Sequence, residues 1–538
     1  MSFLCKALLC LHLWQRLSHP VHGAIGEDGK CPVFVFVPFT IDGSVTGSGD
    51  QVNVGFSHMS AAILAVKHFN QRNSKIVPEL GDLTKGCNIT FDMELSQVFD
   101  TESITHKAAR DVQRANITPC ALVGGWTNLP TSDLAVLAHS LEIPLVAHRA
   151  ENVRVTDPRT SPFATLVYPD LKAEVQASVN YLRFIGRNDY ISILYPQTES
   201  GVQKREAWGA LFNTYDMNYM SSGYHSTFKG KDLRLDDVYG ALKNVKASGY
   251  RTVVIVTENA VEEIPALADA ADALQMNAGE YLFFISGFTS EEGFQWSNQN
   301  ITNLLDGAVA VLPIAPDEKS GARGAPFLQS WSDDFEDILD IVRSKNPIGK
   351  GRPGYVELDN TTFQSVPSFG STFLYDAVIA VGIGACLARV DKGRIIGTDH
   401  LRGVHKVNFT GSTGRLGFGG NFHVKDRENT QFDSKGSRSA GTLQWSAWSL
   451  HHAAYPNMTN DPIEHAILVG LTTGEEGTWE TVRQPIFRDG RLNPPDLLRD
   501  LPNQNYLSGS LRVAGFAFMG IVIFISIALS LWVFVNRN

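Results

Sequence analysis

Residues 120–148 read CALVGGWTNLPTSDLAVLAHSLEIPLVAH, and this stretch decides the fold class. The apolar run CALVGG predicts a strand, and IPLVAH predicts a second strand. Between them, LPTSDLAVLAHSL carries apolar residues at helical spacing, namely Leu134, Leu137, Ala138 and Leu141. Strand, helix and strand in succession indicate a parallel sheet covered by helices.

The same alternation continues on both sides of this stretch. Before it, CPVFVFVPF and NITFDMELS predict strands, and HMSAAILAVKHFNQR and TESITHKAARDVQR predict helices. After Pro169, the strands YISILYP, YRTVVIVTE and EYLFFIS alternate with helices such as LKAEVQASVNYLRFIG and NAVEEIPALADAADALQM. Two blocks of this kind in a chain of 538 residues exceed one core, so we expect an α/β protein with two lobes.

Composition excludes several classes of function. Hydrophobic residues make up 43% and charged residues 19%, as in an ordinary globular protein. The net charge of -10 argues against nucleic acid as a partner. The chain has no His-Glu-x-x-His, Gly-x-Ser-x-Gly or P-loop motif, so we expect neither an enzyme nor a cofactor. It also has no Cys-x-x-Cys pair, so we expect no metal site.

The last residues of the chain are strongly apolar. Residues 513–535 contain no charged side chain and are flanked by Arg512 and Arg537. An α-helix needs about 20 residues to cross the hydrocarbon core of a bilayer, so this run predicts one transmembrane helix in contact with lipid. Trp532 fits the aromatic belt at the membrane surface. A buried core helix is the alternative.

The first residues predict a secretory signal. Lys6 precedes a short apolar run, residues 8–14, and Gly23 and Ala24 offer a cleavage point, so we assign residues 1–24 to a signal peptide. An amphipathic first helix is the alternative. The polar segment 452–510 is expected to be a linker to the membrane.

Four cysteines remain after the predicted signal, an even number that suits an oxidising compartment. We expect a disulfide between Cys87 and Cys120, and the pairing of Cys31 and Cys386 stays open because Cys386 could equally be a small buried hydrophobe. Six sequons for N-glycosylation precede the apolar end, at Asn88, Asn116, Asn300, Asn360, Asn408 and Asn457.

Polar side chains follow several predicted strands. Open parallel sheets bind ligands beyond the carboxyl ends of their strands. Thr127 and Asn128 follow a Gly-Gly pair at such an end, just before a helix whose free N–H groups attract carboxylate or phosphate. Thr198 follows YISILYP, and Glu258 follows TVVIVT. Two such edges could close on one small molecule, although each junction alone is also an ordinary helix cap.

Three stretches carry a resemblance to a known family, namely GFSHMSAAILAVKHFN, GGWTNLPTSDLAVLAHSLEIPLVAH and FGSTFLYDAVIAVG. They resemble the extracellular ligand-binding module of class C G-protein-coupled receptors, with the metabotropic GABA receptors nearest, and the likeness covers residues 31–451. It implies a hinged, two-lobed fold of the type I periplasmic binding kind, related to natriuretic-peptide receptor ectodomains. We therefore assign residues 31–165 and 288–390 to the first lobe, and 166–287 and 391–451 to the second.

The resemblance also implies roles for single residues. Thr127 and Asn128 fall in a loop that holds the ligand carboxylate in the glutamate receptors, and Ala150 falls where a second hydroxyl is usual. Tyr168 matches a ligand-facing position of the GABA branch. Asp170 matches the aspartate that meets the ligand ammonium in the glutamate branch, although on its own it reads as a helix cap.

In the second lobe, Glu258 falls near an aromatic or acidic ligand contact. In the first lobe, Gly370 stands where GABA-binding members have an acidic residue. We expect a cell-surface receptor ectodomain in the plasma membrane, with its N-terminal region outside, that binds an amino-acid-like ligand between its lobes. The resemblance further implies a dimer through the first lobe, and contact with a G protein only if the chain continues beyond Asn538. A single-pass binding protein or co-receptor without signalling is the alternative.

Overall fold

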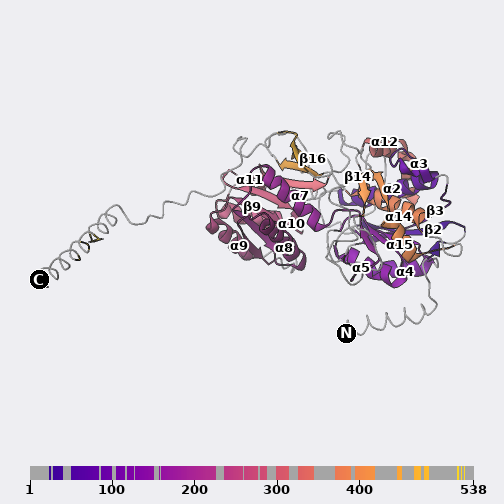
Figure 1. Cartoon of the computed structure of the whole chain (residues 1–538), viewed down its shortest axis with the longest axis horizontal. Coiled ribbons are helices and arrows are strands. Elements are labelled where there is room, and N and C mark those ends of the chain that lie inside the picture. Colours follow the sequence, from indigo (N-terminus) through magenta and orange to yellow (C-terminus); the bar gives the residue numbers. More distant parts are fainter. Residues whose placement is uncertain are drawn as a thin grey trace, which may run out of the picture.

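In a computed structural model of the chain, two large sheets, each covered by helices, form two lobes side by side (Figure 1). The structure describes residues 24–25, 28–39, 50–83, 86–99, 104–115, 118–125, 128–150, 155, 157, 159–225, 235–258, 260–276, 279–287, 299–313, 325–344, 367, 370–388, 394–418, 445–450, 466–473, 478–483, 518–519, 523 and 526.

The first lobe contains a five-stranded parallel sheet in the order β3-β2-β4-β5-β6. Its strands are β2 (Lys30–Phe39), β3 (Thr90–Phe99), β4 (Ala121–Val123), β5 (Leu145–Ala147) and β6 (Ala164–Leu166). The helices between them are α2 (Asp50–Gln71), α3 (Glu79–Asp82), α4 (Ile104–Ala115) and α5 (Asn128–Leu141).

Strand β2 explains why this sheet is covered on both faces. Its central residues are all buried, and successive side chains point to opposite faces of the sheet. Val33, Val35 and Val37 join the core cluster that includes α2. Phe34 and Phe36 join the cluster that includes α4 and α5. A continuous apolar run of this kind is stable only with helices on either side.

The second lobe contains an eight-stranded sheet in the order β17-β16-β15-β11-β10-β9-β7-β8. The strands β7 to β11 are parallel, and β15 to β17 extend the sheet in antiparallel fashion. The parallel strands are β7 (Ile191–Pro196), β8 (Tyr219–Tyr224), β9 (Thr252–Val256), β10 (Leu282–Ser286) and β11 (Val309–Pro313). The others are β15 (Trp445–Leu450), β16 (Ala466–Thr473) and β17 (Thr478–Thr481).

Helices α7 (Leu171–Phe184) and α8 (Glu199–Thr214) cover one face of this sheet, and α9 (Leu235–Ser248), α10 (Ala260–Ala273) and α11 (Gln299–Leu305) cover the other. The α/β fold with parallel sheets flanked by helices is therefore confirmed, and it fits the two-lobed periplasmic-binding type.

The predicted boundary at residue 288 is wrong, because α11 and β11, which follow it, still belong to the second lobe. Strand β11 pairs in parallel with β10, with Phe284 opposite Val309. The chain reaches the first lobe only with α12 (Ala325–Asp333), α13 (Phe335–Ser344) and α14 (Ser371–Leu387).

The predicted return to the second lobe at residue 391 is also wrong. Helix α15 (Gly397–Val404) and the hairpin of β13 (Asn408–Gly411) and β14 (Gly414–Gly417) pack on α14 in the first lobe. The buried carboxylate of Asp376 on α14 accepts hydrogen bonds from the backbone N–H and the hydroxyl of both Ser412 and Thr413, at 2.5 to 2.9 Å. Four bonds to one buried carboxylate fix the hairpin on this lobe.

The segment expected to be a linker contains part of the second sheet. Strands β16 and β17 lie between residues 466 and 481 and pair with β15 and with each other. The ring of Trp479 on β17 packs edge-on against Tyr181 on α7, with 4.8 Å between ring centroids. Strands β16 and β17 are therefore integral to the second lobe.

Among the described residues, disulfides join Cys31 to Cys120 and Cys87 to Cys386, so the expected Cys87–Cys120 bridge is wrong. Cys31 lies on β2 and Cys120 directly precedes the neighbouring strand β4, which brings their Cα atoms to 5.3 Å. Cys87 follows α3 and Cys386 lies in the last turn of α14, with Cα atoms 5.4 Å apart.

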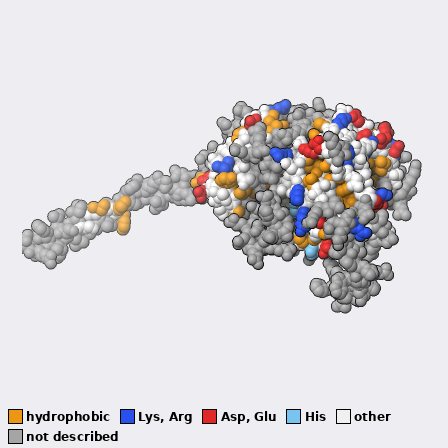
Figure 2. Space-filling model, turned by 45° about the vertical axis from the view of Figure 1, so that its right-hand side comes forward, with side chains coloured by type: hydrophobic (Ala, Val, Ile, Leu, Met, Phe, Trp, Pro, Cys, Tyr) orange, Lys and Arg blue, Asp and Glu red, His pale blue; other side chains and the backbone are white. Residues whose placement is uncertain are grey.

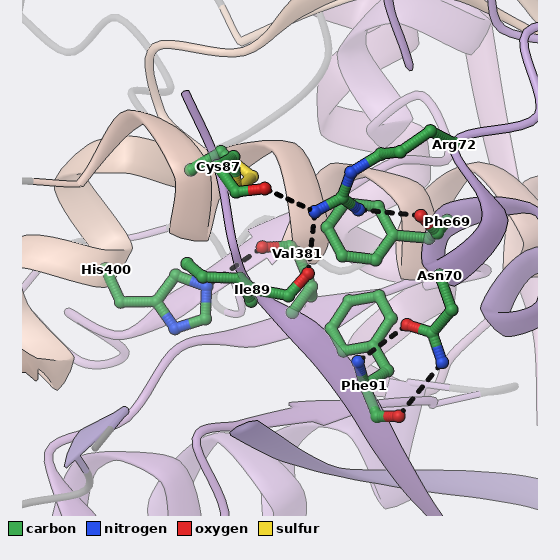
Figure 3. Close-up of a disulfide and its surroundings, with 9 residues drawn as sticks. Phe69, Asn70, Arg72, Cys87, Ile89, Phe91, Val381 and His400 are labelled. Atoms are coloured by element: carbon green, nitrogen blue, oxygen red, sulfur yellow. Dashed lines mark hydrogen bonds between the residues drawn. A yellow bond between two sulfur atoms is a disulfide. The ribbon is translucent and has the colours of Figure 1, made fainter. Parts of the chain in front are cut away.

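Arg72 holds the backbone beside the second disulfide (Figure 3). Its guanidinium donates to the carbonyls of Phe69, Cys87 and Ile89 at 2.6, 3.0 and 2.7 Å, and it lies over the Phe69 ring at 4.3 Å. These contacts join the end of α2 to the chain that leads into β3.

Several predictions fall outside the described residues. These are most of residues 513–535 and the signal peptide except for its last residue, Ala24. Ala24 pairs with Ile396 in a short strand. The sequons at Asn116, Asn360 and Asn457 also lie outside, whereas Asn88 and Asn408 are exposed. Among the residues that the structure describes, no helix has both the length and the apolar character needed to cross a membrane.

Candidate functional site

The carboxyl edge of the second sheet brings two predicted residues together. Thr198 follows β7 and is the N-cap of α8, where its hydroxyl accepts from the backbone N–H of Gly201 at 3.0 Å. The same hydroxyl donates to the carboxylate of Glu258 at 2.5 Å. Glu258 follows β9, the neighbour of β7 in the sheet, and its side chain is exposed. The edge therefore presents a carboxylate held in place by a helix cap.

A second carboxylate lies buried beneath this pair. Glu263 on α10 is fully buried and accepts from the backbone N–H of Glu258 at 3.1 Å. Burial raises its pKa to about 7, because the charged form loses its hydration. The bond from Glu258, the Tyr224 hydroxyl and the charge of Lys204 act in the opposite direction, and the charge of Glu258 adds to the rise. Glu263 is thus placed to change charge near neutral pH.

A buried polar network continues along the same edge to β10. The carboxylate of Glu174 on α7 accepts from the Ser286 hydroxyl and from the Gly287 N–H, both at 3.2 Å. Lys204 on α8 is buried, and its ammonium donates to the Thr257 carbonyl at 3.5 Å. The Ser286 hydroxyl also accepts from the indole N–H of Trp208 at 3.4 Å. Charged and polar groups from α7, α8 and the ends of β9 and β10 thus form one layer.

The carboxyl edge of the first sheet is built from glycine. Gly124 and Gly125 follow β4 with φ angles of 145° and 96°, which favour glycine. A Cβ on Gly125 would lie 2.3 Å from the Thr131 hydroxyl oxygen of α5. The Gly125 carbonyl accepts from the N–H of Arg149, which follows β5. The backbone at the end of β4 therefore lies directly against the start of α5, because glycine has no side chain to separate them.

Two histidines are buried at this edge. His148 directly follows β5, and its ring centroid lies 5.3 Å from that of His58 on α2. Burial lowers the pKa of His148 well below its usual value, and the charges of His58 and Arg149 lower it further. Near His58, the Ser57 and Ser371 hydroxyls form a buried hydrogen bond of 2.9 Å that joins α2 to the first residue of α14.

Tyr168 lies where the chain leaves the first lobe. It is buried, and its ring packs edge-on against Phe373 of α14 with centroids 5.0 Å apart. Gly370 caps α14 at a φ of 93°, so this helix starts from a conformation that suits glycine. The Tyr168 position predicted to face a ligand is therefore packed against the start of α14.

The remaining predicted residues have other surroundings. Asp170 is buried and caps α7, because its carboxylate accepts from the Ala173 N–H at 2.9 Å. Ala150 is buried in the core cluster around α5. Asn128 begins α5, but its side chain and all of Thr127 lie outside the described residues. Of the predicted set, only Thr198 and Glu258 contact each other among the described contacts.

Sequence reasoning missed the buried charged groups. His148 could have been found, because it ends the strand IPLVAH just as Thr198 and Glu258 follow theirs. Glu174, Lys204 and Glu263 gave no such signal, since charged residues within helices are usually exposed. Within the described part of the chain, no three His, Cys, Asp or Glu side chains are grouped to hold a metal ion.

Comparison with known families agrees with this architecture. The model of the receptor family ligand binding region matches residues 58–434, which is more than half of the chain. The chain belongs to this family. The predicted resemblance to class C receptor and natriuretic-peptide receptor ectodomains is confirmed at this level, and the family supports an extracellular ligand-binding region. No curated protein matches the sequence.

Proposed function

We propose that the chain is the ectodomain of a plasma-membrane receptor that closes around a small amino-acid-like ligand. The family supports a receptor that binds a ligand. The observation that carries the finer proposal is the Thr198–Glu258 pair, which presents a fixed carboxylate at the carboxyl edge of the second sheet. Such an edge is where open parallel sheets bind their ligands.

The two edges offer complementary chemistry for a zwitterion. Glu258 is exposed and already oriented, so it suits a ligand ammonium. The bare backbone at Gly125 and the N-terminus of α5 suit a ligand carboxylate, because helix N-terminal N–H groups attract anions. A ligand that bridges both edges would stabilise the closed arrangement by its greater affinity for that state.

We further propose that the receptor resembles the metabotropic GABA receptors in its layout, is dimeric through its first lobe, and is anchored by residues 513–535. The uncharged sequence supports the anchor, as do Phe518, Met519 and Ile523, which are helical and expose 70%, 54% and 56% of their surface. Coupling to a G protein would require further membrane helices beyond these residues. A membrane-tethered binding protein without signalling is the competing proposal, and six more apolar spans in the complete transcript would decide against it.

Tryptophan emission tests the ligand site directly. Trp208 is buried, and its indole bonds to Ser286 in the polar layer beside Glu174, so a ligand at this edge should alter its emission. The full-length chain in detergent is titrated with glycine, glutamate and 4-aminobutyrate while emission and thermal unfolding are followed. Trp208→Phe identifies the signal that belongs to this residue.

Matched charge variants separate the site from general electrostatics. Glu258→Gln should weaken the binding of an ammonium-bearing ligand about tenfold or more, because a charge-assisted hydrogen bond is lost. Glu280→Gln removes the same charge before β10, at the amino edge of the same sheet, and should leave affinity unchanged. The ligand should be recovered chemically unaltered after incubation, because we propose binding without catalysis. No emission change and no thermal shift with any small zwitterion would overturn the proposal.

A further inference from the structure

A groove on the second lobe lies between α10 and α11, two neighbouring helices that cover the same face of the sheet. Its volume is about 160 Å³. Pockets for drug-sized ligands are typically about 300–1,000 Å³, so this groove suits something nearer a single sugar ring. Ala271, Met276 and Leu304 form an apolar floor, and the exposed Asp272 and Gln275 form a polar rim.

One of the sequons lies at this groove. Asn300 is the second residue of α11, it lines the groove, and it starts the sequence Asn300-Ile301-Thr302. Its side-chain amide is half-buried and donates from Nδ2 to the carboxylate of Asp269 on α10 at 2.9 Å. The sequon nitrogen that would receive a glycan is therefore held by a neighbouring helix within this groove.

We propose that Asn300 carries an N-linked glycan whose first N-acetylglucosamine lies in this groove. The donor is a lipid-linked oligosaccharide diphosphate of the secretory pathway. Carbon C1 of its first sugar bonds to Nδ2 of Asn300 as the bond from C1 to the diphosphate oxygen breaks. The lipid diphosphate leaves with that electron pair, and the amide nitrogen releases one proton.

The modified side chain keeps its contact with α10. A glycosylated amide still has one N–H, so the modified side chain keeps a donor for the bond to Asp269. A sugar ring has an apolar C–H face, which packs on Ala271 and Met276, while its hydroxyl and acetamide groups bond to Asp272 and Gln275. The groove and the sugar are therefore matched in both size and polarity.

Two other sequons provide an internal comparison. Asn88 and Asn408 are exposed, and neither lines this groove. A glycan on Asn88 is expected to be fully solvated, whereas the linkage at Asn300 is shielded by its groove. The inference rests on the extracellular placement in the proposed function but not on ligand binding. A chain that binds no zwitterion but carries this glycan would separate the two proposals.

The test uses the full-length chain from a eukaryotic secretory host. Peptide mass mapping should find a glycan on Asn300 in the wild type and in Thr302→Ser, which keeps the sequon, but not in Asn300→Gln. Peptide-N-glycosidase should release the Asn300 glycan from the native protein several-fold more slowly than the Asn88 glycan. After denaturation the two rates should be equal.

The rim variants test the groove itself. Gln275→Ala and Asp272→Ala change exposed side chains, so the fold should be retained, and each should bring native release at Asn300 toward the Asn88 rate. The Asn88 rate should not change. An unmodified Asn300 in the wild type would overturn the proposal, whatever the state of Asn88. Equal native release at both sites, unaffected by the rim variants, would overturn the placement in the groove.

Discussion

The Thr198 hydroxyl donates to the Glu258 carboxylate at 2.5 Å while it accepts from the Gly201 N–H at 3.0 Å. One side chain thus caps α8 and orients the exposed carboxylate at the neighbouring strand end. Because both bonds depend on the same hydroxyl, changes at this position affect helix stability and ligand affinity together. Thr198 joins the end of β7 to the end of β9 at the point where we propose that a ligand binds.

Removing this hydroxyl should have two separable effects. Thr198→Ala should lower the free energy of unfolding by about 1 kcal/mol, because the α8 cap is lost. In a Glu258→Ala background the same change should cost less, since only the cap remains to be lost. Chemical denaturation of the four proteins of this cycle measures the coupling. Thr198→Ser keeps both bonds and should resemble the wild type, and zero coupling would contradict the role assigned to the Thr198–Glu258 bond.

Glu263 should make stability depend on pH. Its pKa of about 7 in the folded protein lies above the ordinary 4.5, so folding favours the protonated form. The resulting stability is fully present below about pH 4.5 and is lost as pH rises to about 7. The upper bound on this loss is on the order of 3 kcal/mol.

The measurement compares wild type with Glu263→Gln, whose amide oxygen can still accept from the Glu258 N–H. Unfolding free energies at about pH 5 and about pH 8 should differ by less in the variant than in the wild type. Comparison with the wild type cancels the contributions of other buried groups, such as His148. Glu280→Gln, an exposed carboxylate, serves as the control and should leave the wild-type difference intact. An unchanged pH dependence in Glu263→Gln would refute the assignment.

The alternation of elements could be predicted because each strand and helix carries its own periodicity. The buried run in β2 and the apolar spacing in α5 are local patterns. The lobe assignment could not be predicted in the same way. Strand β11 reads VAVLP, which suits either sheet, and only its pairing with β10 places it in the second. Residues 408–417 belong to the first lobe because a buried Asp376 binds them there.

The candidate site also has one part that could be predicted from the sequence and one part that could not. Thr198 and Glu258 could be predicted because parallel strands place their carboxyl ends at one edge. Their mutual bond, and the burial of Lys204 and Glu263, depend on how α8 and α10 pack on the sheet. Asp170 is confirmed as a helix cap, because its carboxylate accepts from the first turn of α7, and its role toward a ligand stays a prediction.

The disulfides should be essential for the first lobe. Cys31 and Cys120 are separated by 89 residues, so replacing both with serine should cost about 4 kcal/mol in loop entropy. Cys87 and Cys386 are separated by 299 residues, and their loss should cost slightly more because loop entropy rises slowly with length. Thermal unfolding with and without reductant measures both effects. Non-reducing peptide maps should contain these two linkages, and a Cys87–Cys120 peptide would contradict the structure.

Gly125 should not tolerate even the smallest side chain. Its φ of 96° is unfavourable for alanine by about 1–2 kcal/mol, and the added Cβ would also lie 2.3 Å from the Thr131 hydroxyl oxygen. Gly186, with a φ of 78° and no atom within 4 Å of a built Cβ, provides the matched control. Gly186→Ala should cost only the backbone term, whereas Gly125→Ala should cost more and also weaken ligand binding at the first edge. If thermal unfolding gives equal losses for both variants, the close approach of Gly125 to α5 does not limit this position.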